Sequence, residues 1–218
     1  MGISLTFAAI RRISIIDDNA PARGSYEFTV EDLGREPVQE SGPLGDLNTC
    51  ITNVMGKADA ALCDHHLKVN TYSIFNGAEL VAGLYKVKFP AVLCTNWTGS
   101  ADEMRQFRRF IPSLVDAETL DTDSLRYGLE SCIKEFNGEF RAVRRPWRTQ
   151  VRIEDMETEQ GHLFINVVVP AWSAKVVRLP ASAVPPEVVA KLKPGFRLHA
   201  NVNLGADNYE ELFFEKWE

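Results

Sequence analysis

The sequence predicts an α/β domain with a doubly wound, parallel, five-stranded sheet, followed by a small, mainly antiparallel β barrel or sandwich. Three observations predict this fold. Over the first 136 residues, short β-like runs alternate with helix-like stretches, as in a series of βα units. Two of these runs, residues 60–63 and 91–94, are apolar throughout, as expected of central strands covered on both faces. After Asn137-Gly138, β-like stretches follow one another with turn residues between them.

Five βα units account for the first part of the chain. Pro21 suits the first turn of a helix, and Gly34 ends that helix. The predicted strands are residues 13–16, a weak strand near Val38, 60–63, 91–94 and 110–115. The predicted helices are residues 21–33, 44–55, 78–85, 101–109 and 122–136. Such a series fits a flavodoxin-like fold, in which the strand order reverses beside the first strand.

The second part of the chain has a different pattern. Its predicted strands are residues 149–153, 162–169, 175–179, 196–204 and 211–217. A short helix at 186–192 interrupts them, and Pro194-Gly195 ends it. Five short strands in so few residues indicate a small antiparallel barrel. We therefore expect two domains, 1–138 and 139–218.

Composition limits the cellular setting and the partners. The net charge of −6 argues against a general nucleic-acid or anionic-membrane binder, because both need a positive field. No apolar run approaches the roughly 18–20 residues that span a bilayer. The four cysteines are far apart in the sequence and are interpreted as reduced thiols. We expect a cytoplasmic protein that is not bound to a membrane.

Polar side chains follow three of the predicted strands. Asp17 and Asp18 follow the first, Asp64 follows residues 60–63, and Thr95 follows residues 91–94. Carboxyl ends of parallel strands meet at one edge of the sheet, where ligands bind. Carboxylates that lack nearby cations repel one another, and a hard cation such as Mg²⁺ relieves the repulsion. The pattern therefore predicts a Mg²⁺ site at this edge.

The order and spacing of these residues carry a resemblance to a known family. Asp18 and Asp64 are 46 residues apart, and Asp64 and Thr95 are 31 residues apart. Asn76-Gly77 also lies where the family often has a turn. With the five βα units, residues 10–136 resemble the receiver domain of bacterial response regulators. The region after it resembles no family that we identify.

The resemblance implies roles for individual residues. Asp17, Asp18 and Asp64 would hold Mg²⁺ together with the backbone carbonyl of His66. Asp64 would accept a phosphoryl group from a histidine kinase or phosphotransfer protein, and Thr95 would hydrogen-bond the bound phosphoryl group. The expected function is that of a two-component-type signalling protein in which phosphorylation of Asp64 controls protein interactions of the C-terminal β domain. Receivers often pair through their fourth and fifth helices, which leaves a homodimer open.

One departure from the family supports an alternative. Receivers have a lysine at the end of the fifth strand, usually before a proline, that pairs with the phosphoryl group. Here no lysine lies between Lys88 and Lys134, although Pro112 could mark the position. The alternative is a degenerate pseudo-receiver that is not phosphorylated and acts as a protein-binding adapter or regulatory subunit.

A metal-dependent hydrolase using the same carboxylates is a further alternative. Phosphatases with an aspartyl nucleophile on this architecture carry Asp-x-Asp after the first strand, whereas this chain has Asp17-Asp18-Asn19. No general base accompanies the cluster. We therefore expect that the protein is not an enzyme.

The second part of the chain contains a basic cluster around Pro146-Trp147. Its members are Arg141, Arg144, Arg145 and Arg148. The cluster could bind phosphate, RNA or an acidic partner. Residues 139–218 contain as many acidic as basic residues, which favours a solvated junction and makes nucleic-acid binding unlikely. Aromatic residues near the C-terminus could anchor a protein partner.

Overall fold

The computed structural model describes residues 5–69, 71–96 and 104–218. These form two compact units. The first contains the described residues up to 96 together with Phe110–Glu139, and the second contains residues 104–109 together with Phe140–Glu218. The sequence-based domain limits, 1–138 and 139–218, remain a prediction. The compact units differ from those limits at residues 104–109 and at Glu139.

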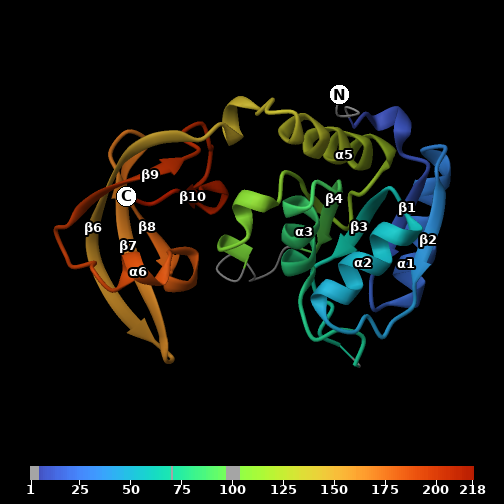
Figure 1. Ribbon diagram of the computed structural model, residues 1–218, viewed down its shortest axis with the longest axis horizontal. Helices are drawn as coiled ribbons and strands as arrows, with labels where there is room; N and C mark the ends of the chain where they lie inside the picture. Colours follow the sequence, from blue (N-terminus) through green and yellow to red (C-terminus); the bar gives the residue numbers. More distant parts are fainter. Residues whose placement is uncertain (1–4, 70, 97–103) are drawn as a thin grey trace. The chain divides into compact units, whose positions relative to one another are not determined.

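The first unit is built on a parallel sheet (Figure 1). Its strand order is β2-β1-β3-β4-β5, and every neighbouring pair is parallel. The order reverses between β1 and β3, as in a flavodoxin-like fold, so the predicted doubly wound fold is confirmed. The strands are β1 (Arg12–Ile16), β2 (Glu36–Glu40), β3 (Ala60–Asp64), β4 (Ala91–Thr95) and β5 (Leu114–Asp116).

Helices cover both faces of this sheet. Ile13 and Ile15 of β1 pack in one core with Tyr26 and Val30 of α1 and with residues of α5. Because side chains alternate along a strand, the intervening residues of β1 face the side on which α2 and α3 contact one another. The helices are α1 (Ala20–Asp32), α2 (Leu47–Lys57), α3 (Gly77–Lys86) and α5 (Thr122–Phe136), and their predicted counterparts are confirmed.

Side chains fix where the helices begin. The Asn19 side chain accepts a hydrogen bond from the backbone N–H of Ala22 at the start of α1. Asp46 and Asp121 cap α2 and α5 in the same way. Each cap satisfies N–H groups that have no partner within the first helical turn. Among the described residues, none of the helices is long and apolar enough to cross a membrane.

The fifth strand lies later in the chain than predicted. The sequence predicts a strand at 110–115, but β5 spans Leu114–Asp116, and the 3₁₀ helix η2 (Arg108–Phe110) precedes it. Ile111 and Pro112 are buried, so the apolar run reflects packing rather than a strand. Pro112 also has no N–H to donate to a strand ladder. The predicted helix at 101–109 lies partly outside the described residues.

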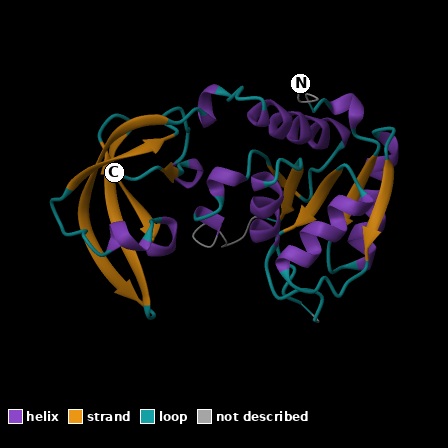
Figure 2. Cartoon of the chain, viewed as in Figure 1, coloured by secondary structure: helices purple, strands orange, loops and turns teal. Residues whose placement is uncertain are grey.

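The second unit contains one antiparallel sheet, in the order β10-β9-β6-β7-β8. Figure 2 shows that strands dominate this unit, whereas helices and strands alternate in the first. Valine and isoleucine side chains from β6, β7 and β8 form its core, so the predicted antiparallel β domain is confirmed as half a barrel. The elements are β6 (Trp147–Glu159), β7 (His162–Val169), β8 (Ser173–Pro180), α6 (Pro186–Val189), β9 (Arg197–Val202) and β10 (Phe214–Glu215).

Candidate functional site

An acidic cavity lies at the carboxyl edge of the first sheet. Asp17 and Asp18 follow β1, Asp64 ends β3, and these two strands are hydrogen-bonded neighbours. The cavity has a volume of about 250 Å³. It lies where the strand order reverses, which is the usual ligand position in such sheets. Its walls are Asp17, Asp18, Asn19, Ala22, Tyr26, Asp64, His66, Asn96 and Ala117.

Tight turns hold two of the carboxylates in place. The carboxylate of Asp17 accepts a hydrogen bond from the backbone N–H of Asn19 at 2.7 Å. The carboxylate of Asp64 accepts one from the backbone N–H of His66, also at 2.7 Å. Aspartate side chains commonly bond the backbone two residues later in this way. The turns keep the side chains at the cavity instead of in solvent.

The electrostatics of the cavity favour a cation. Burial raises the pKa of Asp17 to about 6, and the nearby charges of Asp64 and Asp18 add to the effect. Burial also raises the pKa of Asp64, although hydrogen bonds from the backbone of His66 and His65 oppose the rise. Ionised carboxylates in such a setting are destabilised, and a bound cation would remove that penalty.

The donor atoms of the cavity fit Mg²⁺ in one coordination mode. Carboxylate and carbonyl oxygens are its preferred protein ligands. Within residues 5–69, 71–96 and 104–218, no three His, Cys, Asp or Glu side chains lie close enough to hold one ion together. Mg²⁺ usually keeps several waters and uses one or two carboxylates, so the donors allow only a water-rich site in which one or two of Asp17, Asp18 and Asp64 would be direct ligands.

Gly77 sets the position of the Asp64 turn. Its backbone N–H donates to the carbonyl of His65 at 2.9 Å. A Cβ atom on Gly77 would lie 1.8 Å from the carbonyl oxygen of Asp64, far inside contact distance. Only glycine therefore lets the start of α3 approach the site loop. The sequence indicated a turn at Asn76-Gly77, but not this steric role.

Thr95 lies beside the cavity but not in its wall. Its side chain is buried, and its hydroxyl makes no hydrogen bond to any residue that the structure describes. Burying a hydroxyl without a hydrogen bond costs free energy. The Thr95 hydroxyl can therefore donate a hydrogen bond to a ligand, or accept one from it, at little further cost in free energy. The next residue, Asn96, does line the cavity.

The end of the fifth strand carries an acid. Asp116 is the last residue of β5 and pairs in register with Thr95. The expectation that Pro112 marks the family's lysine position was wrong, because β5 begins after that residue. The strand instead ends in Asp116, whose carboxylate accepts a hydrogen bond from the N–H of Glu118 at 2.9 Å.

Sequence reasoning missed the apolar wall of the cavity. Ala22 and Tyr26 lie one turn apart on α1, on the face toward the site. The Tyr26 hydroxyl lies 3.8 Å from the Cys94 sulfur in β4. Ala22 and Tyr26 are four residues apart and follow the acidic pair closely in the sequence. That spacing is the signal that could have identified them.

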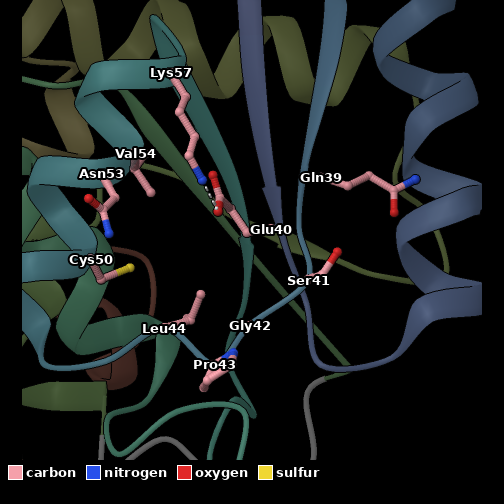
Figure 3. Close-up of a pocket in the computed structure, with 10 residues that line it drawn as sticks. All are labelled: Gln39, Glu40, Ser41, Gly42, Pro43, Leu44, Cys50, Asn53, Val54 and Lys57. Atoms are coloured by element: carbon pink, nitrogen blue, oxygen red, sulfur yellow. Dashed lines mark hydrogen bonds and ion pairs between the residues drawn. The ribbon is translucent and has the colours of Figure 1, made fainter.

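A second cavity of about 340 Å³ lies at the carboxyl end of β2 (Figure 3). Lys57 reaches Glu40 there, with 2.8 Å between the ammonium nitrogen and the carboxylate oxygen. The hydroxyl of Ser14 donates to the other oxygen of Glu40 at 3.3 Å. The buried Glu40 is thus paired on both oxygens, unlike the acids of the first cavity.

The basic cluster of the second unit is largely used for structure. Arg144 is buried and donates to the backbone carbonyls of Arg108 and Arg109. Arg148 pairs with Glu218 at 2.9 Å. The guanidinium of Arg145 lies 4.5 Å from the centre of the Trp147 ring. These contacts agree with a junction more than with a phosphate or RNA site.

Comparison with known proteins finds receiver domains among solved structures. No protein-family model matches the sequence, and no curated protein matches it either. A response regulator receiver domain protein from Clostridium thermocellum is 16% identical with a TM-score of 0.45, covering 58% of this chain and 97% of its own. The signal receiver domain of a modulated diguanylate cyclase from Desulfovibrio desulfuricans G20 is 20% identical with a TM-score of 0.46, covering 59% and 97%. The fold of the first unit is assigned from its own strand order and not from these likenesses.

Proposed function

We propose that this protein is a two-component-type signalling protein whose Asp64 accepts a phosphoryl group in the presence of Mg²⁺. The observation that carries the proposal is the convergence of Asp17, Asp18 and Asp64 on one cavity at the point where the strand order reverses. The raised pKa values of Asp17 and Asp64 support the proposal, because they indicate ionised carboxylates that a bound cation would stabilise.

Each residue has a task in the transfer. The Asp64 carboxylate attacks the phosphorus of a donor phosphohistidine, the P–N bond breaks, and an acyl phosphate forms on Asp64 as the imidazole leaves. Asp17, Asp18 and the backbone carbonyl of His66 would hold Mg²⁺, which offsets the charge on the phosphoryl oxygens. The Thr95 hydroxyl, which is buried and makes no hydrogen bond within the part of the chain that the structure describes, would then turn toward the new phosphate. The donor would be a histidine kinase or a phosphotransfer protein.

Labelling with a small donor tests the transfer directly. The full chain is incubated with acetyl phosphate and Mg²⁺, and its intact mass is measured. We expect the mass of one phosphoryl group to be added, and we expect Asp64→Asn to abolish the addition. Glu118→Gln, an exposed change on the same edge, is the control and should label like the wild type. Absence of an adduct, or an adduct that persists in Asp64→Asn, would refute the proposal.

A second candidate function is a phosphorylation-independent adapter that binds a protein through its β unit. Asp116 favours it, because a carboxylate at the end of β5 repels a phosphoryl dianion where the family has a lysine. The adapter predicts that Asp64→Asn leaves the set of proteins captured from the native host unchanged.

Introducing a lysine side chain at the end of β5 separates the two candidate functions. If the acid at the end of β5 has ended phosphoryl transfer, Asp116→Lys should raise the yield of labelled protein well above that of the wild type, whereas Glu118→Lys should not. An adduct that forms to the same extent in the wild type and in Asp116→Lys would argue against the adapter.

A further inference from the structure

The second cavity of the first unit has a wall that is held in place by the protein itself. The cavity lies between the carboxyl end of β2 and α2 and has a volume of about 340 Å³. Small-molecule sites have volumes of roughly 300–1,000 Å³. The Tyr72 hydroxyl donates to the backbone carbonyl of Glu40 at 2.6 Å, and the backbone carbonyl of Tyr72 accepts from the N–H of Leu44 at 2.9 Å. The β2 side of the cavity is therefore fixed without a ligand.

One face of α2 forms the opposite wall (Figure 3). Asn53, Val54 and Lys57 lie three, four and seven residues after Cys50, so these side chains share one face of the helix. Leu44, Cys50 and Val54 are buried and form the apolar part of the lining. Burial raises the pKa of Cys50 to about 11, so its thiol stays neutral near neutral pH and belongs to this apolar part.

The charged part of the lining is an ion pair whose two members are held differently. The Glu40 side chain is 9% exposed, and its carboxylate accepts a hydrogen bond from the Ser14 hydroxyl at 3.3 Å. The Lys57 side chain is 52% exposed, and its ammonium nitrogen lies 2.8 Å from a carboxylate oxygen of Glu40. A buried carboxylate needs a cationic partner. The lysine side chain can turn into solvent if another ammonium group takes its place, because half of it is already exposed.

Two further polar groups of the lining are available to a ligand. Ser41 and Asn53 line the cavity and are exposed. Their side chains make no hydrogen bond to any residue that the structure describes. A hydroxyl and a primary amide can each donate and accept hydrogen bonds. The cavity thus offers neutral polar groups beside its ion pair.

The neighbouring opposite charges select the charge of the ligand. An anion attracted to Lys57 is repelled by Glu40, and a cation meets the reverse situation. A zwitterion gains from both residues, because its ammonium would bind Glu40 and its carboxylate would bind Lys57, so that two ion pairs replace one. We infer that this cavity binds a free α-amino acid with a small apolar side chain, which would pack on Leu44, Cys50 and Val54. The cavity shares no lining residue with the acidic cavity, so this site is independent of the proposed function.

Calorimetric titration of the full chain with three matched compounds tests the charge selection. L-Valine carries both charges, isovalerate lacks its ammonium, and isobutylammonium lacks its carboxylate. We expect L-valine to bind at one site per chain, and each of the other two to bind at least about tenfold more weakly, because each loses a charge-assisted contact. Equal affinity for all three compounds would indicate apolar binding alone. That result, or no binding of L-valine at millimolar concentration, would overturn the inference.

Substitutions in the same titration locate the site. Lys57→Gln should weaken L-valine binding about tenfold, and Asn53→Ala should weaken it about threefold without a change of charge. Lys68→Gln is the matched control, because the Lys68 side chain is 49% exposed and pairs with Glu79 at 3.3 Å, and neither residue lines the cavity. It should bind L-valine like the wild type. Equal affinities of Lys57→Gln and Lys68→Gln would place L-valine elsewhere on the protein and overturn the inference.

Discussion

The two units bury charge in opposite ways. In the first, Asp17 and Asp64 line a cavity, and burial raises the pKa of both carboxyl groups. In the second, Arg144 is as deeply buried as Asp17, yet it donates to two carbonyls and lies 5.1 Å from the centre of the Phe213 ring. Arg144 finds hydrogen-bond acceptors within the protein, whereas the pKa values of Asp17 and Asp64 stay raised although Arg23 and His66 oppose the rise. A buried group whose pKa stays shifted against its charged form therefore indicates a binding site better than the number of charges does.

Removing the buried Arg144 from the basic cluster should cause the largest loss of stability. Arg144→Ala leaves the carbonyls of Arg108 and Arg109 without this donor, and an acceptor left unsatisfied in the interior costs about 1–3 kcal/mol for each of the two. Arg148→Ala, which breaks an exposed pair, should cost less than about 1 kcal/mol. Urea unfolding of the full-length variants measures both values. Equal losses would show that burial of Arg144 has no special role.

A steric change beside the acidic cavity should have an intermediate effect. Gly77→Ala would place a methyl group against the carbonyl of Asp64 and should cost about 1–3 kcal/mol. Gly24→Ala, in a helix where nothing lies within 4 Å of the added atom, should be neutral or slightly stabilising. Thermal unfolding compares the two. A tolerated Gly77→Ala would mean that the Asp64 turn is not held by α3.

Neutralising a carboxylate of the acidic cavity should raise the stability of the protein, whereas Arg144→Ala should lower it. The pKa of Asp17 is about 6 in the folded protein and 3.8 as the ordinary value, so the folded state binds the proton more tightly. The ionised form therefore costs stability above pH 6, and this cost disappears as the pH falls toward 4. In metal-free buffer Asp17→Asn should gain about 1–2 kcal/mol at pH 7.5 and about 0.5 kcal/mol or less at pH 4. A gain that does not depend on pH would contradict this electrostatic account.

Local pattern was enough to predict most of the first unit. The apolar runs 60–63 and 91–94, and the helix-boundary residues Pro21 and Gly34, fix strands and helices through their neighbours in sequence. The strands in turn predict that the carboxylates lie close together, because parallel strands bring their carboxyl ends to one edge of the sheet.

The features that were missed depend on contacts distant in sequence. The run 110–115 has the composition of a strand, but only its packing and the pairing of Asp116 with Thr95 show where β5 lies. The assignment of residues 104–109 to the second unit depends on Arg109 meeting Glu215, which no local pattern encodes. Gly77 was recognised as a turn residue, but its closeness to Asp64 appears only in three dimensions.

The central claim is that the acidic cavity is completed by a divalent cation. Calorimetric titration of the metal-free full chain with Mg²⁺ at pH 7.5 tests it most directly, with Asp18→Asn as the variant and Asp123→Asn, on α5, as the control. We predict one Mg²⁺ site in the wild type and the control, a loss of affinity of tenfold or more in Asp18→Asn, and weakening below pH 6 as Asp17 binds a proton. An absence of Mg²⁺ binding, or binding that Asp18→Asn leaves unchanged, would contradict the account.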